Sequence, residues 1–214
     1  NFFTPMRLFF ALMVVVGHSY IVAMRDPSAE PFLFFHYKPS YLAVNLFFIL
    51  SGFLITKSLL GNRNIAEYAA ARILRIFPAL IIYMLFVMFV MGPLVTSLPM
   101  AEFFSHREFL NQPMKVLTFY RTQMVLPGAF ENNSAQVSSA TLWTLRYEAL
   151  AYIGTAMAFC MGLMKRNWMI LGQCLAFLIL WPLAHATGLF DEIMGTFQRI
   201  LRLGVCYSIG AAIY

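Results

Sequence analysis

Long apolar stretches, each about the length needed to cross a lipid bilayer, alternate with shorter polar stretches along the chain. A helix needs roughly 20 apolar residues to cross the hydrocarbon of a membrane. This criterion predicts about six spans: residues 5–24, 41–60, 78–97, 142–164 and 168–187, and a sixth that starts near Phe197. The pattern therefore predicts an all-α protein, a polytopic bundle of transmembrane helices.

Two segments do not fit this pattern. Residues 61–75 are polar on one side and apolar on the other, which is typical of a short helix that lies in the membrane interface. We expect this helix to end before Pro78 opens the third span. Residues 98–141 carry charges of both signs and several prolines, so we expect a long loop with short helices.

Composition agrees with a membrane protein. Hydrophobic residues make up 61% of the chain and charged residues 11%, whereas soluble domains average roughly 45–50% and about 25%. The net charge of +6 is expected to serve membrane topology rather than nucleic-acid binding. The three cysteines lie in apolar stretches without metal-ligand spacing, so neither a disulfide nor a metal site is predicted.

The distribution of positive charge predicts the orientation. Cytoplasmic loops of membrane proteins are enriched in Lys and Arg. Here the cations between spans two and three and between spans four and five fall on one side, which is cytoplasmic if the N-terminus is cytoplasmic: Lys57, Arg63, Arg72, Arg75, Lys165 and Arg166. The same orientation puts Arg199 and Arg202 near the outer end of span six, which the rule does not explain.

The first span carries two ionisable residues, Arg7 and His18. They are eleven positions apart, which brings them within about 20° of each other on a helix and separates them by roughly 16 Å along it. Arg7 can reach the cytoplasmic headgroups, whereas His18 lies deeper. A histidine packed in the core and bonded to a neighbouring helix is one interpretation. A functional site is the other, because ionisable groups inside a membrane are costly and histidine is the usual base near neutral pH.

Glu148 lies about six residues into the fourth span, roughly 9 Å deep. His18 lies at a similar depth, about six residues from the outer end of the first span. We expect its carboxylate to orient and stabilise the imidazole. The alternative is a structural ion pair with an arginine elsewhere in the chain. Arg146 is a poor partner, because residues two apart on a helix do not face each other.

Arg72 and Arg75 share a helix face before the third span, where their guanidinium groups could bind phosphates. Anionic lipid headgroups and topology alone are equally open explanations. In the second span, Asn45, Gly52 and Thr56 form a stripe of small and polar residues, which predicts close helix packing.

Four features together resemble the acyltransferase-3 family of integral membrane O-acyltransferases. They are Arg-x10-His in the first span, FFILSGFLI in the second, Arg-x-x-Arg before the third, and LWTLRYE at the start of the fourth. Each is weak alone, but the four occur in the order and spacing of the family. The resemblance implies that residues 1–214 are the N-terminal part of one acyltransferase domain, truncated at its C-terminal end.

The resemblance also implies a function. The enzyme would transfer an acyl group, in the first place acetyl, from cytoplasmic acyl-CoA to a hydroxyl of a cell-surface or exported glycan, such as lipopolysaccharide. His18 would be the catalytic base, Arg7 its companion, and Glu148 the acidic residue of the later span. Arg72 and Arg75 would bind the CoA phosphates, with no metal. A bacterial inner-membrane location follows from the same resemblance.

A second class of function stays open at this point. A transporter could use His18 and Glu148 as a proton relay. Such a protein should show broken helices or internal repeats, and neither is visible in the sequence. The identity of the acceptor, the oligomeric state, and direct transfer versus an acyl-enzyme are not predicted.

Overall fold

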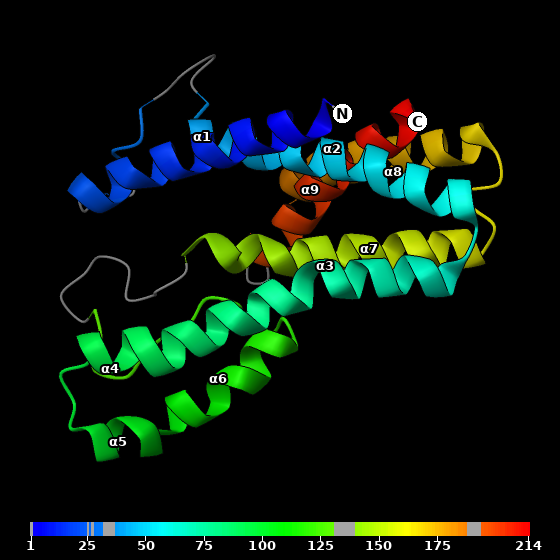
Figure 1. Ribbon diagram of the computed structural model, residues 1–214. Coiled ribbons are helices and arrows are strands. Elements are labelled where there is room, and N and C mark those ends of the chain that lie inside the picture. The colour runs from blue at the N-terminus through cyan, green and yellow to red at the C-terminus, as the bar shows by residue number, and fades with distance from the viewer. Residues whose placement is uncertain (1, 25, 27, 32–36, 131–139, 188–193) are drawn as a thin grey trace. The chain divides into compact units, whose positions relative to one another are not determined.

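The computed structural model is all-α, as predicted (Figure 1). It describes residues 1–214 except 1, 25, 27, 32–36, 131–139 and 188–193. The chain forms two compact units. Unit 1 comprises Asn1–Ile65 and Leu150–Tyr214, and unit 2 comprises Ala66–Ala149. Each unit is described by itself below.

The described part of unit 1 consists of four long helices and the later part of a fifth. Its helices are α1 (Phe3–Met24), α2 (Pro39–Asn62), the later part of α7 (Thr144–Cys160), α8 (Asn167–Thr187) and α9 (Met194–Ile213). α1 packs on α2, α2 packs on α9, and α9 packs on α8 (Figure 1). α2 thus lies between the helix that carries His18 and the last described helix.

α1 and α2 run antiparallel. The rings of Phe3 and Phe53 lie 5.6 Å apart between centroids, and those of Phe10 and Phe47 lie 5.5 Å apart. Residue numbers therefore fall along α2 as they rise along α1. Phe10 belongs to a buried apolar cluster shared by both helices, so one face of α1 is fixed against α2.

That face of α1 contains both ionisable residues. The residues of α1 that are buried or half-buried form one stripe at helical spacing, and every other described residue of the helix is exposed. The stripe consists of Phe3, Arg7, Phe10, Met13, Val14, Gly17, His18 and Ile21. The predicted placement of Arg7 and His18 on one helix face is therefore confirmed.

α2 and α9 run parallel to each other. Asn45 contacts Arg202, and further along both helices Gly52 lies against the backbone of Tyr207. Parallel packing is what the predicted order of alternating spans requires of the second and sixth spans. The stripe of small residues predicted from Asn45 and Gly52 therefore marks a helix–helix interface, as expected.

Two glycines bring the backbones of α2 and α9 together. A Cβ atom on Gly52 would collide with the carbonyl oxygen of Tyr207, and one on Gly210 would collide with the carbonyl oxygen of Ile49. Without side chains at these positions the helices approach closely, which is the usual way that membrane helices gain packing contacts.

Gly52→Ala is therefore expected to destabilise the protein, because the added methyl group meets backbone that cannot rotate away. Overpacking of this kind costs about 1–3 kcal/mol. Gly61→Ala is the matched control on the same helix, since a Cβ there has no neighbour within 4 Å. Thermal unfolding in detergent should show a lower midpoint for Gly52→Ala than for the parental protein, and an unchanged midpoint for Gly61→Ala. Equal midpoints would contradict the close crossing.

Unit 2 contains one long helical rod, and here the sequence-based prediction is wrong. α3 (Ile65–Phe86) continues through a π-helical turn, η1 (Val87–Met91), into α4 (Gly92–Val95). The interfacial helix and third span, expected to separate before Pro78, are one apolar segment of 31 residues, Ile65–Val95. Proline removes only one backbone hydrogen bond, and apolar membrane helices tolerate this loss.

The π-helical turn ends at Gly92 and Pro93. Gly92 donates its N–H to the carbonyl of Val87, five residues back. Pro93 has no backbone N–H, so the usual bond to the carbonyl four residues earlier is also missing there. The absence of a side chain at Gly92 also lets the ring of Phe103 approach, because a Cβ there would lie 2.5 Å from that ring.

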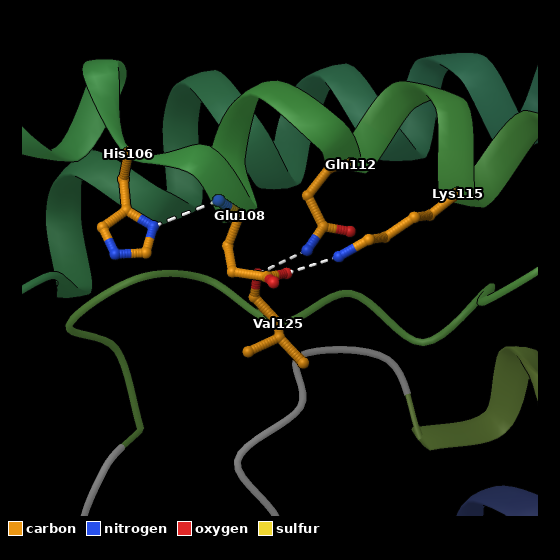
Figure 2. Close-up of polar contacts among 5 residues, drawn as sticks. All are labelled: His106, Glu108, Gln112, Lys115 and Val125. Atoms are coloured by element: carbon orange, nitrogen blue, oxygen red, sulfur yellow. Dashed lines mark hydrogen bonds and ion pairs between the residues drawn. The ribbon is translucent and has the colours of Figure 1, made fainter.

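Two short helices follow in the predicted loop, α5 (Met100–Ser105) and α6 (Arg107–Leu117). Figure 2 shows how polar contacts fix α6. His106 Nδ1 accepts from the backbone N–H of Glu108 at 3.1 Å, and Gln112 Nε2 donates to the carbonyl of Val125 at 2.6 Å. Lys115 Nζ donates to Glu108 at 2.6 Å, which holds the pKa of that carboxyl below its usual range. Residues 131–139 of the predicted loop lie outside the described part.

The helix η2 (Ala140–Trp143) leads into α7, which ends at Cys160 rather than near Met164 as predicted. The reason is Gly162, whose φ of 75° is favoured by glycine. Leu163 then donates its N–H to the carbonyl of Ala158 at 2.8 Å, and Gly162 donates to that of Phe159 at 3.0 Å. This is the hydrogen-bond pattern of a helix ended by a left-handed glycine.

Three of the six predicted spans are confirmed as helices long and apolar enough to cross a membrane: Phe3–Met24, Pro39–Asn62 and Ile65–Val95. Asn167–Leu183, at the predicted fifth span, is a shorter apolar helix. α7 and α9 are helices at the predicted fourth and sixth spans, and their passage through the membrane stays a prediction.

Candidate functional site

His18 has one ring nitrogen fixed by its own helix. Its Nδ1 lies 2.9 Å from the carbonyl oxygen of Val14. A carbonyl can only accept a hydrogen bond, so Nδ1 must carry the proton of the neutral ring. The lone pair of the neutral imidazole is then on Nε2. This tautomer is the one in which Nε2 can accept a proton from a substrate.

A buried carboxylate, which sequence analysis did not predict, lies beside this part of α1. Glu30 is only 2% exposed. It accepts hydrogen bonds from the backbone N–H and the hydroxyl of Ser40, both at 2.6 Å. Gly17 leaves the space, because a Cβ there would collide with the Glu30 carboxylate. The chain after α1 thus folds back against the helix turn next to His18. There the Glu30 carboxylate accepts a backbone N–H that would otherwise lack a partner in the first turn of α2.

Glu148 lies next to an arginine of α3. Its Oε1 is 4.0 Å from Nε of Arg75. Of the two predicted interpretations, an ion pair with an arginine elsewhere in the chain is therefore present. Arg146 points to another partner, as expected, since its Nε donates to the carbonyl of Phe119 at 3.0 Å.

This contact corrects the predicted depths. Arg75 was expected at the cytoplasmic interface and Glu148 near the outer face, but side chains within 4.0 Å must lie at one level. The predicted depths of Arg75 and Glu148 therefore cannot both hold, because two side chains in contact cannot lie near opposite faces of a membrane.

A cavity of about 300 Å³ opens beside the Arg75–Glu148 pair in unit 2. Its other lining residues are apolar or aromatic and come from α3, η2 and the start of α7: Ile76, Ala79, Leu80, Tyr83, Leu142 and Leu145. Arg72, one turn before Arg75, is half-buried, and its guanidinium carbon lies 5.7 Å from the centre of the Tyr68 ring. The arrangement combines a mostly apolar cavity with the charged side chains of Arg75 and Glu148 in its lining.

The structure brings together some of the predicted site residues. Arg7 and His18 share one face of α1 in unit 1, and Arg72, Arg75 and Glu148 are in unit 2. His18 and Glu148 belong to different units, so their pairing stays a prediction. Within the described residues, no group of three or more His, Cys, Asp and Glu side chains is arranged to hold a metal ion.

Comparison with known proteins gives consistent matches. The sequence model of the acyltransferase-3 family, described as an acyltransferase domain, matches residues 2–214. An O-acetyl transferase of Shigella phage Sf6 is 32% identical over 158 residues, which cover 74% of this chain and 45% of the relative. Nodulation protein 10 of Rhizobium leguminosarum bv. viciae is 29% identical over 159 residues, covering 72% of this chain and 42% of the relative.

The chain therefore spans less than half the length of these curated relatives. No solved structure matches it significantly. The family match covers nearly all of the chain, and the resemblance seen in the four sequence motifs is confirmed. On this evidence the chain belongs to the acyltransferase-3 family.

Proposed function

We propose that the full-length protein is a membrane O-acyltransferase that moves an acyl group, in the first place acetyl, from cytoplasmic acyl-CoA to a hydroxyl of a cell-surface or exported glycan. The observation that carries the proposal is the contact of His18 Nδ1 with the carbonyl of Val14, which leaves Nε2 as the ring nitrogen that can accept a proton. Membership of an acyltransferase family favours this enzyme over the transporter that His18 and Glu148 alone left open.

The chemistry needs a base and a stabilised oxyanion. A sugar hydroxyl attacks the thioester carbonyl while His18 Nε2 takes its proton. The C–S bond then breaks, and the departing CoA thiolate receives that proton. Direct attack and an acyl-enzyme share this requirement. Arg7, on the same face of α1, would contribute positive charge along the path of the donor.

Donor binding is assigned to unit 2. Arg72 and Arg75 would hold CoA phosphates through charge-assisted hydrogen bonds, and the apolar cavity beside Arg75 suits the uncharged pantetheine arm and the acyl group. Glu148, at 4.0 Å from Arg75, would orient that guanidinium. With the N-terminus in the cytoplasm, the cationic cluster around α3 would face the compartment that supplies acyl-CoA.

The relatives support the reaction type but not its details. The phage protein is named an O-acetyl transferase, which is consistent with acetyl transfer to oxygen. For this chain, the acetyl group, the glycan, the example of lipopolysaccharide and the bacterial inner membrane are parts of the proposal.

The direct test is mass spectrometry of cell-surface glycans from cells with and without the gene for the full-length protein. We expect glycan species heavier by an acyl group in the first cells, and their loss in the second. Mild alkali should remove the added mass, because it cleaves O-esters. Identical spectra, together with no transfer of label from radioactive acetyl-CoA to the glycan fraction, would contradict the proposed function.

A further inference from the structure

An arginine that the orientation rule left unexplained lies between α2 and α9. Arg202 is half-buried, two turns into α9. Its Nη1 donates to Oδ1 of Asn45 at 3.1 Å, and its guanidinium carbon lies 4.1 Å from the centre of the Tyr41 ring. A guanidinium at this distance over an aromatic face makes a favourable cation–π contact.

The aromatic part of this cluster extends outwards. Tyr41 is stacked with Tyr37, with centroids 5.9 Å apart and 17° between ring planes. Tyr37 is 53% exposed and Tyr41 37% exposed. Tyr37, Tyr41, Asn45 and Arg202 together form a surface, called the Tyr37–Arg202 surface below, that has a flat aromatic part and a polar part.

Packing alone does not account for the polar part. An arginine side chain has five N–H donors, and one of them is used by Asn45. Within the described residues no carboxylate forms a salt bridge with Arg202. A charged side chain between apolar helices is costly and marks a functional site by default. Because Asn45 Oδ1 accepts from Arg202, its amide nitrogen is left to donate as well.

The surface lies at nearly the level of His18. Gly17 is opposite Ser40 across the antiparallel pair of α1 and α2, since a Cβ on Gly17 would be 3.1 Å from Cβ of Ser40. His18 and Tyr41 are the next residues along their helices. Because the two helices are antiparallel, these steps run in opposite directions, so His18 and Tyr41 differ in level within unit 1 by about two residue rises, roughly 3 Å.

We propose that the Tyr37–Arg202 surface binds a sugar ring of the acceptor. The C–H face of a pyranose would pack on the exposed tyrosine rings, and its hydroxyl oxygens would accept from Arg202 and from the Asn45 amide. Ligand sites typically combine aromatic walls with a few such polar groups. This inference rests on the proposed function and identifies residues that hold its acceptor at the level of the base.

A lipid headgroup is the competing ligand. Tyrosine and arginine are both frequent at membrane interfaces, where arginine can bind lipid phosphate. The geometry favours the sugar, because the Arg202 guanidinium is laid on a ring and already bonded to an amide. A phosphate site would gain more from several guanidinium groups pointing at one centre.

The test uses the full-length protein in proteoliposomes, with radioactive acetyl-CoA as donor. The acceptor is the glycan fraction extracted from host cells that lack the gene. Tyr37→Leu and Arg202→Gln are each expected to raise the acceptor concentration for half-maximal transfer by about tenfold, with an unchanged KM for acetyl-CoA. Tyr37→Phe is the matched control, because it keeps the ring face, and it should leave the acceptor curve unchanged.

Binding of fluorescently labelled extract to the same proteoliposomes separates the two proposals. Transfer by the parental protein together with an unchanged acceptor curve for Tyr37→Leu would overturn this inference alone. Glycan binding that Tyr37→Leu weakens, without any transfer, would support the surface and contradict the proposed function. Because Arg202 is half-buried, Arg202→Gln could fold poorly. Tyr37 is exposed, so Tyr37→Leu should fold normally, and its acceptor curve is the decisive measurement. If the effect of the variants on transfer and binding depends on the phosphatidylglycerol content of the vesicles rather than on the glycan concentration, the surface binds lipid and the inference is overturned.

Discussion

Replacing His18 by alanine in the full-length protein is expected to lower turnover by about 10²–10⁴-fold, the usual contribution of a general base. The structure supplies the reason, because Nδ1 is held by the carbonyl of Val14 at 2.9 Å and Nε2 is thereby the basic nitrogen. The KM for acetyl-CoA should change little, since the predicted phosphate-binding residues lie on another helix. The measurement is the rate of label transfer from acetyl-CoA to extracted glycan.

Ser19→Ala is the matched control on the same turn. Ser19 is exposed, and its hydroxyl donates to the carbonyl of Val16 in its own helix, so its loss should leave turnover unchanged. Equal turnover in correctly folded His18→Ala and Ser19→Ala enzymes would return His18 to the alternative of a packed core histidine and would end the proposed mechanism.

Glu148→Gln separates the two roles open to this carboxylate. If Glu148 mainly stabilises the imidazolium of His18, kcat should fall, by less than in His18→Ala, with an unchanged donor KM. If its contact with Arg75 matters more, the donor KM should rise. The split between kcat and KM is informative because an interaction made only in the transition state affects kcat, whereas uniform binding affects KM.

The helices and the shared face of α1 could be predicted because they depend on local sequence. Span length follows from runs of apolar residues, and the position of Arg7 relative to His18 follows from helical periodicity. Gly52 likewise indicated close packing, and its contact with Tyr207 shows where. These features need no knowledge of which helix lies beside which.

The features that were not predicted depend on contacts between residues far apart in the sequence, or on local preferences that oppose each other, as at a proline inside a helix. Arg75 and Glu148 lie 73 positions apart in the sequence, and no local pattern shows that they meet. α3 continues through Pro78, whereas proline normally indicates a helix start or break. Glu30 stands in the stretch between the first two predicted spans, and nothing local shows that it folds back on Ser40. Arg202 did leave a signal, as a cation on the side where the orientation rule expects none.

Changing Arg72 and Arg75 together to glutamine is expected to weaken acetyl-CoA binding strongly while the protein stays in the membrane. Each charge-assisted hydrogen bond contributes about 1.5–3 kcal/mol, or roughly 10- to 150-fold in affinity for one arginine. The two effects need not add, because residues one helix turn apart can bind the same phosphate group. Equilibrium binding of radioactive acetyl-CoA to the purified full-length protein measures the loss.

Lys57→Gln is the matched control for the loss of a positive charge away from the donor site. Lys57 belongs to the same predicted cytoplasmic cluster and is exposed, but it does not line the cavity beside Arg75. Its loss should leave the affinity for acetyl-CoA unchanged. Dephospho-CoA thioesters offer a second comparison, because they lack the 3′-phosphate. If the arginines bind that phosphate, the double variant should no longer distinguish acetyl-CoA from acetyl-dephospho-CoA. Unchanged donor affinity in the folded double variant would leave Arg72 and Arg75 with a topological or lipid-binding role, and the donor site would have to lie elsewhere.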